Sequence, residues 1–187
     1  MQRRAEAHPK LGAFCRCAQL VLFAGPLAFD AASGRCVGRR HIQRLKAGNL
    51  LARQLEVLGI EADASVRVLV LTGAGERAFC AGRDLNEPTV AGETMAPYLG
   101  EDVPFSKPAV AAVNGLAYGG GWFLAQMCDV VVASEDAEFA LPGARVGAAP
   151  AWAVWLHGVV PEKAALELLM TGNRITALRA HQIGLDG

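Results

Sequence analysis

The chain has 187 residues, no formal net charge, 52% hydrophobic and 19% charged residues. This length predicts one domain with a sizeable core, and the balanced charge gives no reason to expect nucleic acid or a membrane surface as a partner. Five cysteines without a C-x-x-C pair predict neither a zinc site nor a disulfide framework, and they fit a cytoplasmic location.

Residues 1–45 are the least informative part of the sequence. The apolar stretch at 17–29 follows several basic residues and so faintly resembles a signal peptide, but its continuous core spans only about eight residues and no small-residue cleavage site stands out. The stretch is also too short and too interrupted for a membrane span. A strand is possible at 20–23, and Gly25-Pro26 would end it. The basic run from Arg35 to Lys46 predicts a solvated, mobile segment rather than a phosphate contact. We therefore divide the chain into an N-terminal segment, 1–45, and a core domain, 46–187.

A helix followed by a buried strand opens the core domain. Leucines at helical spacing predict an amphipathic helix over 47–62, which ends near Asp63. The β-branched run at 66–71 reads as a strand that is buried on both faces. A helix-then-strand pattern that recurs along the chain predicts an α/β fold with mainly parallel strands.

Residues 73–78 match the letters of the dinucleotide fingerprint G-x-G-x-x-G/A. The fingerprint must open a helix, whereas the residues that follow are short, apolar and end at Gly82. We therefore do not expect a dinucleotide-binding oxidoreductase. Gly82 instead allows a sharp turn, in which the N–H of Arg83 could donate to a ligand and Asp84 could cap a helix starting near Leu85.

The Pro- and Gly-rich residues 86–106 predict a loop of the kind that forms lids or binding surfaces. Three of its carboxylates, Glu87, Glu101 and Asp102, are candidate acid–base groups, although plain surface positions explain them more simply. A fourth candidate, His157, lies in an apolar stretch and is more simply explained as a core histidine.

A glycine triplet organises the centre of the chain. A strand at 109–113 is broken by Asn114-Gly115, and Gly119, Gly120 and Gly121 then lead into a buried helix at 122–127 and a strand at 130–132. The first turn of a helix leaves N–H groups unpaired, and glycine lets a ligand oxygen approach them. The triplet therefore predicts an anion or oxyanion site, with a tight helix-on-sheet turn as an equally weighted alternative.

Short elements complete the chain. We expect a strand at 137–141 that runs into a turn at 142–143, and a second turn at 146–150. An apolar stretch with roughly helical spacing follows at 152–159. A helix then opens at Pro161 and ends at 171–173, and a last helix at 177–183 is capped by Thr176 and ended by Gly184.

Four segments, 66–85, 107–134, 137–147 and 161–185, together resemble the crotonase family, also called the enoyl-CoA hydratase/isomerase family. The resemblance covers about residues 48–187. It implies an α/β fold, a crotonase-like spiral of ββα units, usually assembled as a trimer or hexamer. It also implies an acyl-CoA thioester as substrate, with no cofactor beyond the coenzyme A of that substrate.

The resemblance assigns roles by motif. The backbone N–H groups of Arg83 and Gly120 match the oxyanion hole that holds the thioester carbonyl, and the adenine of coenzyme A is expected near residues 81–85. The matched substrate-binding positions are Ala81, Gly82, Asp84, Leu85, Gly119, Phe123, Pro142, Gly143 and Gly147.

Departures from the family pattern bear on the chemistry. The two glutamates that hydratases of this family use as acid and base correspond here to Phe123 and Gly143. The usual N-terminal strand is not recognisable in 1–45, and the family's C-terminal helices would follow Gly187. The sequence thus predicts an incomplete or divergent member: an enoyl-CoA hydratase/isomerase-like enzyme with unusual acid–base groups, or a non-catalytic or fragmentary acyl-CoA binder.

Overall fold

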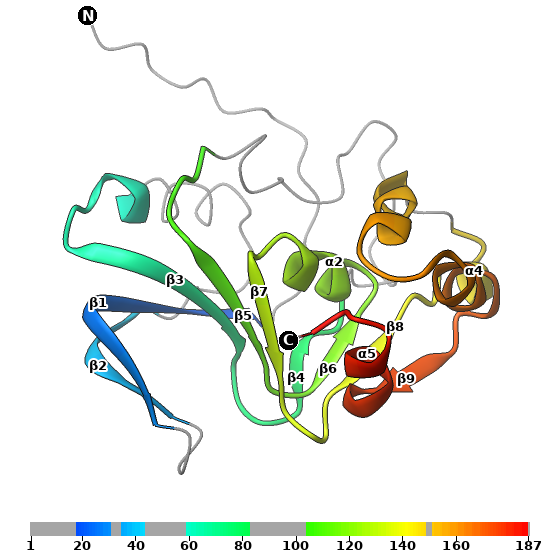
Figure 1. The fold of residues 1–187 in the computed structure, drawn as a ribbon, viewed down its shortest axis with the longest axis horizontal. Coiled ribbons are helices and arrows are strands. Elements are labelled where there is room, and N and C mark those ends of the chain that lie inside the picture. The colour runs from blue at the N-terminus through cyan, green and yellow to red at the C-terminus, as the bar shows by residue number, and fades with distance from the viewer. Residues whose placement is uncertain (1–17, 31–34, 44–58, 83–103, 149–150, 187) are drawn as a thin grey trace, which may run out of the picture.

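The computed structural model describes residues 18–30, 35–43, 59–82, 104–148 and 151–186. A five-stranded sheet in the order β2-β1-β3-β5-β7 forms one layer (Figure 1). Strands β3, β5 and β7 run parallel, and β1 is antiparallel to both of its neighbours. The strands span Ala18–Asp30 (β1), Arg35–Gln43 (β2), Val66–Gly73 (β3), Ala109–Val113 (β5) and Val130–Ala133 (β7).

The β1–β2 hairpin corrects two expectations for the N-terminal segment. Strand β1 does not end at Gly25-Pro26 but continues to Asp30, and its pairing with β2 shifts register between Ala24 and Ala28. Proline lacks an N–H for the ladder, so the pair is accommodated in an irregularity within the strand. Residues 35–43 of the basic run form β2 rather than a mobile segment, and its residues 44–46 lie outside the described part of the chain. The expected turn at Ser33-Gly34 lies outside the described residues.

A second sheet in the order β4-β6-β8-β9 stands beside the first. Its strands are three residues each: Ala78–Cys80 (β4), Leu116–Tyr118 (β6), Glu138–Ala140 (β8) and Arg174–Thr176 (β9). Strands β4, β6 and β8 are parallel, and β9 is antiparallel to β8. The expectation that residues 73–78 do not open a helix is confirmed, since they lead from β3 into β4.

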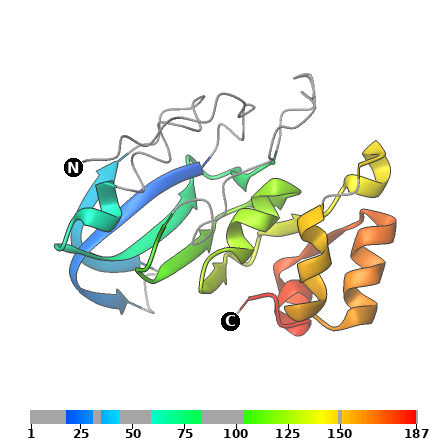
Figure 2. The same ribbon diagram turned by 90° about the horizontal axis from the view of Figure 1, so that it is seen from above.

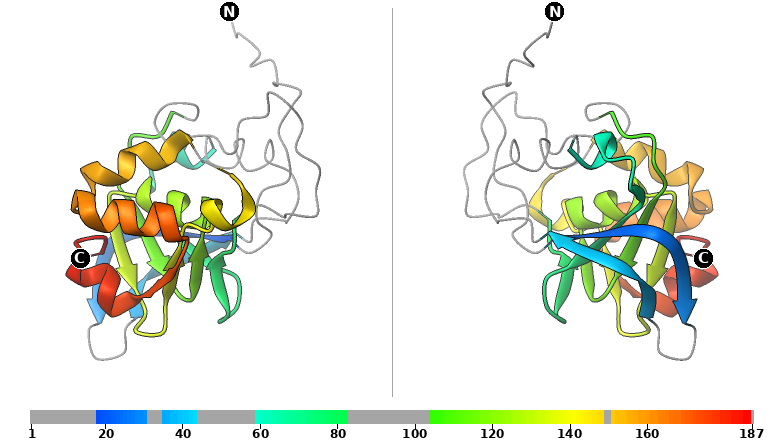
Figure 3. Two further views of the ribbon diagram at one scale, coloured as in Figure 1. Left: turned by 90° about the vertical axis from the view of Figure 1, so that its right-hand side faces the viewer. Right: turned by 90° about the vertical axis from the view of Figure 1, so that its left-hand side faces the viewer.

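The helices are α2 (Gly120–Gln126), α3 (Gly143–Val146), the 3-10 helix η1 (Ala151–Gly158), α4 (Glu162–Thr171) and α5 (Ala177–Gln182). Residues 59–62 are also helical, so the expected end of that helix near Asp63 is confirmed, while residues 47–58 are outside the described part. Helices η1, α4 and α5 gather at the end opposite the β1–β2 hairpin (Figure 2), and Figure 3 shows these two ends face on.

Helix boundaries follow their capping residues closely. Pro161 is the N-cap of α4 rather than its first residue, and Gly172, at φ +62°, ends α4 by donating its N–H to Leu168 O at 3.0 Å. The hydroxyl of Thr176 accepts from Arg179 N at 3.3 Å, which confirms the predicted cap of α5. Helix α3 was expected as a turn; Gly147, at φ +68°, ends it after one turn.

The core lies between the two sheets and the helical layer. Its largest fully buried side chains are Trp122, Phe79, Phe139, Leu69 and Leu156. The rings of Trp122 and Phe139 meet edge to face, with centroids 5.6 Å apart, and so join α2 to β8. The predicted burial of Cys80 and Cys128 is confirmed, and burial raises the pKa of the Cys128 thiol to about 12. None of the described helices is long and apolar enough to cross a membrane.

Candidate functional site

The two glycine turns singled out in the sequence lie next to each other. Gly82 follows β4 at φ +86°, and Gly119 follows the neighbouring parallel strand β6 at φ +54°. A Cβ atom placed on Gly82 would lie 2.7 Å from the Tyr118 carbonyl oxygen and 3.2 Å from Gly120 N. The backbone after β4 therefore runs directly beside the first residue of α2.

Each position of the glycine triplet suits glycine for a different structural reason. Gly119 takes the positive φ, donates its N–H to Ala140 O at 2.8 Å, and accepts from Phe123 N at 3.1 Å. Since that last bond is the first of α2, the N–H of Gly120 is left without an acceptor among the described residues. Gly121 packs so tightly that a Cβ atom there would lie 1.9 Å from Cys80 O. The tight helix-on-sheet interpretation is thus confirmed at Gly121, and the oxyanion interpretation of Gly120 stays a prediction.

The positions matched to the family's glutamates are apolar and close to this turn. Phe123 is 8% exposed and belongs to the core cluster. Gly143 begins α3 and is half-buried, directly after Pro142. The Cδ atom of Pro142 is 4.0 Å from a Cβ atom placed on Gly119, so the β8–α3 turn borders the glycine turn.

Other predicted site residues are placed less centrally. Ala81 is exposed at the end of β4, and Gly147 is exposed at the end of α3. His157 is exposed on η1, so the expectation of a core histidine is wrong: its neighbour Leu156 is the residue that η1 turns into the core. Six predicted residues lie outside the described part of the chain: Arg83, Asp84, Leu85, Glu87, Glu101 and Asp102.

Sequence reasoning missed a polar cluster on the second sheet. Tyr118 Oη donates to Glu138 Oε2 at 2.8 Å, and Arg174 Nη1 lies 3.4 Å from the same oxygen. Burial, together with the Glu138 carboxylate, raises the pKa of the Tyr118 phenol above its ordinary value. The three residues lie on β6, β8 and β9, and only the pairing of these short strands brings them together. No local pattern in the sequence signals that pairing.

Tyr118 is expected to ionise at higher pH than an ordinary tyrosine, whose pKa is about 10. The pKa of the Tyr118 phenol is higher in the folded than in the unfolded chain, so the protonated phenol contributes stability below the unfolded pKa. This contribution is lost as pH rises through the folded pKa. The chain has two tyrosines, so a phenolate absorbance titration can separate them. Tyr118→Phe should remove the higher transition and Glu138→Gln should lower its pKa; a titration that Glu138→Gln leaves unmoved would contradict the assignment.

The two sheets and the adjacent glycine turns define an α/β protein of the crotonase fold, in which the Gly82 and Gly119 turns lie side by side at the ends of parallel strands. The model of the enoyl-CoA hydratase/isomerase family matches residues 51–186, and the chain belongs to that family.

Relatives of known activity agree with this assignment. Carnitinyl-CoA dehydratase of Proteus mirabilis is 41% identical over 135 residues, which are 66% of this chain and 51% of that protein. The 2,3-dehydroadipyl-CoA hydratase of Escherichia coli is 39% identical, with 78% of this chain and 61% of that protein covered. Mitochondrial enoyl-CoA hydratase of Pongo abelii is 37% identical, with 80% and 56% covered.

Solved structures share the fold. Enoyl-CoA hydratase from Bacillus anthracis superposes with a TM-score of 0.64 at 35% identity, covering 73% of this chain and 57% of that one. Enoyl-CoA hydratase from Mycobacterium avium gives a TM-score of 0.60 at 36% identity, covering 72% and 57%. The chain thus spans little more than half the length of the relatives it matches.

Proposed function

We propose that the chain binds an acyl-CoA thioester, whose carbonyl oxygen accepts hydrogen bonds from the backbone N–H groups of Gly120 and Arg83. The observation that carries this proposal is the 3.2 Å approach of a Gly82 Cβ position to Gly120 N, because Arg83 is the next residue after Gly82. The names of the relatives support the substrate class, since each acts on a CoA thioester.

Two such donors would stabilise the negative charge that develops on the thioester oxygen when an enolate-like state forms. Removing one donor of this kind typically costs about 3–4 kcal/mol of barrier. Glycine at position 120 suits the role, because no side chain stands between the N–H and an approaching oxygen.

The side chains beside this turn favour binding over hydration. Hydration of a double bond needs a positioned acid and base, whereas Phe123 is packed into the core and Gly143 has no side chain. We therefore propose that the chain is either an enoyl-CoA hydratase/isomerase-like enzyme that takes its acid–base groups from elsewhere, or a non-catalytic acyl-CoA binder. The buried, apolar Phe123 favours the second.

Crotonyl-CoA separates these alternatives. Calorimetry measures its binding, and the loss of enoyl absorbance measures its hydration. Binding without turnover would support the non-catalytic alternative, and turnover within a few hundred-fold of ordinary hydratases would support the enzyme. Absence of both would overturn the proposed function.

Gly120→Val is expected to abolish crotonyl-CoA binding, because the new side chain would occupy the approach to the N–H. The matched control is Gly158→Val, at an exposed glycine that has nothing within 4 Å of a Cβ atom. Calorimetric titration of both variants checks the prediction. Equal affinity for the two would contradict a role of the Gly120 N–H.

We further propose that the chain forms a homotrimer or hexamer in the cytoplasm. Helix α4 exposes Leu166 and Met170, which lie one turn apart and are 42% and 75% exposed, and such apolar surface suits a subunit contact. The buried thiols of Cys80 and Cys128 fit a reducing compartment. Sedimentation equilibrium tests the assembly, and a monomer at micromolar concentration would contradict it.

A further inference from the structure

A cavity of about 560 Å³ lies between strands β6, β8 and β9 of the second sheet and helices α3 and α4. Its size is typical of small-molecule sites, which span about 300–1,000 Å³. Polar side chains from β6, α3, α4, β9 and the connection between α4 and β9 line it: Tyr118, Arg145, Glu167, Thr171, Asn173 and Arg174. Of these, only Glu167 is acidic, against two arginines.

The positive charge of Arg145 is not paired with any carboxylate in the part of the chain that the structure describes. Its Nε donates to Thr171 O at 3.1 Å, and its Nη2 donates to the amide oxygen of Asn173. Both acceptors are neutral, and no carboxylate of the described residues lies within ion-pair distance of this guanidinium. The contact with Thr171 also suits the C-terminus of α4, but it leaves Nη1 available to a further acceptor.

The chain holds Arg145 in one position. Gly172 adopts φ +62°, and a Cβ atom on it would lie 3.1 Å from Arg145 Cγ and 3.3 Å from Pro142 Cα. The aliphatic part of the arginine therefore packs over a glycine while its head is fixed by two hydrogen bonds. A cation held in this way loses little conformational freedom when it binds a partner.

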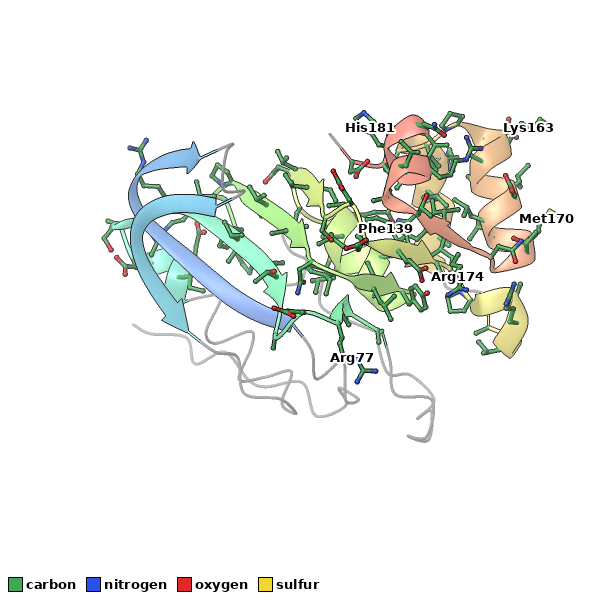
Figure 4. All side chains as sticks on the ribbon, turned by 90° about the horizontal axis from the view of Figure 1, so that it is seen from below. Arg77, Phe139, Lys163, Met170, Arg174 and His181 are labelled. Atoms are coloured by element: carbon green, nitrogen blue, oxygen red, sulfur yellow. The ribbon has the colours of Figure 1, made fainter. Side chains whose placement is uncertain are left out.

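Arg174 adds a second, weakly engaged cation. Its side chain is 72% exposed, and its contact with Glu138 is a long one of 3.4 Å to an oxygen that already accepts from Tyr118. Glu167 forms no ion pair with either arginine. Figure 4 shows Arg174 beside the short helix α3. Glu138 and Glu167 together balance the two arginines in number, but only Arg174 is ion-paired, so Arg145 is left without a carboxylate partner among the described residues.

We propose that this cavity binds a small molecule through an oxyanion group, phosphate or carboxylate, held by the guanidinium groups of Arg145 and Arg174. Planar guanidinium matches the oxygens of both groups, and the amide N–H₂ of Asn173 provides a further donor. The cavity borders the glycine turn at Tyr118, Ala140 and Pro142. The proposed anion ligands Arg145, Asn173 and Arg174 take no part in the proposed oxyanion hole, so this inference does not depend on acyl-CoA binding.

The test is calorimetric titration of the whole chain with inorganic phosphate and, separately, with succinate, at ionic strength held constant with sodium chloride. We expect saturable binding of at least one anion. If only one of the two binds, the result shows whether the cavity prefers a phosphate or a carboxylate group. Arg174→Gln should weaken binding about tenfold, as the loss of one charged hydrogen bond does. Arg145→Gln should weaken it at least as much.

The matched control is Arg77→Gln, because Arg77 is exposed, lies outside the cavity and points away from the fold in Figure 4. It should leave binding unchanged. Saturable binding of neither anion would overturn the proposal, as would an equal loss of affinity in Arg77→Gln. If Arg145→Gln fails to fold, Arg174→Gln decides the question, because its side chain is mostly exposed and its removal leaves the packing intact.

Discussion

Gly121→Ala is expected to lower the free energy of unfolding by about 3 kcal/mol, near the upper end of the usual cost of overpacking. The added Cβ atom would lie 1.9 Å from the carbonyl oxygen of Cys80 and 2.6 Å from its carbonyl carbon. Both are backbone atoms, so no side-chain rotation relieves the clash, and α2 must move away from β4. Urea unfolding, followed by circular dichroism, measures the effect.

The matched control for this substitution is Gly158→Ala, since nothing lies within 4 Å of a Cβ atom at that exposed position. The control should keep the unfolding midpoint of the unaltered chain. If Gly121→Ala unfolds at the same urea concentration as the control, the close packing of α2 on β4 is refuted.

Phe123→Glu is expected to be destabilising in a way that depends on pH. The side chain at this position is 8% exposed in an apolar cluster, and burial raises the pKa of an introduced carboxyl above about 4.3. Between the unfolded and the raised folded pKa, the folded state binds more protons, so stability falls as pH rises. The slope is about 1.4 kcal/mol per pH unit.

Phe123→Gln isolates this charge, because glutamine has nearly the same size and stays neutral. The two variants should be similarly stable in mild acid and diverge as pH rises, with Phe123→Glu the less stable. Urea midpoints measured over that range check the prediction. Equal stability at every pH would show that position 123 is accessible to water.

These effects matter for an experiment that introduces glutamate at both positions matched to the family's two glutamates, 123 and 143. Gly143→Glu is the milder change, since it puts an acidic residue in the first turn of α3, where the helix dipole favours it. Phe123→Glu also removes core packing. A gain of crotonyl-CoA hydration in the double variant would therefore have to be measured at a pH and temperature at which that variant is folded.

Periodic apolar runs made much of the fold predictable. The strand at 66–71 and the helices after Pro161 and Thr176 were recognised because each has several residues of regular spacing or a clear cap. Strands β4, β6 and β9 were missed, because three residues do not establish a period. The predicted strand at 20–23 is shorter than β1, because the pairing of β1 with a strand on each side overrides the tendency of Gly25-Pro26 to end a strand.

The candidate site was predictable to the extent that it depends on glycine. Gly82 and Gly119 were identified as turns, and the structure sets them side by side through the β4–β6 pairing. The cluster of Tyr118, Glu138 and Arg174 depends on strand register and on residues up to 56 positions apart in the chain, a separation that local sequence patterns do not reach.

The closest contacts between α2 and the end of β4 are made by main-chain atoms, with Gly121 against Cys80 O and Gly82 against Gly120 N. An alanine scan would therefore pass over this centre, since the truncation of neighbouring side chains leaves its geometry in place. The same property frees the surrounding side chains to diverge. Side chains around this centre can therefore change without moving the main-chain contact between β4 and α2.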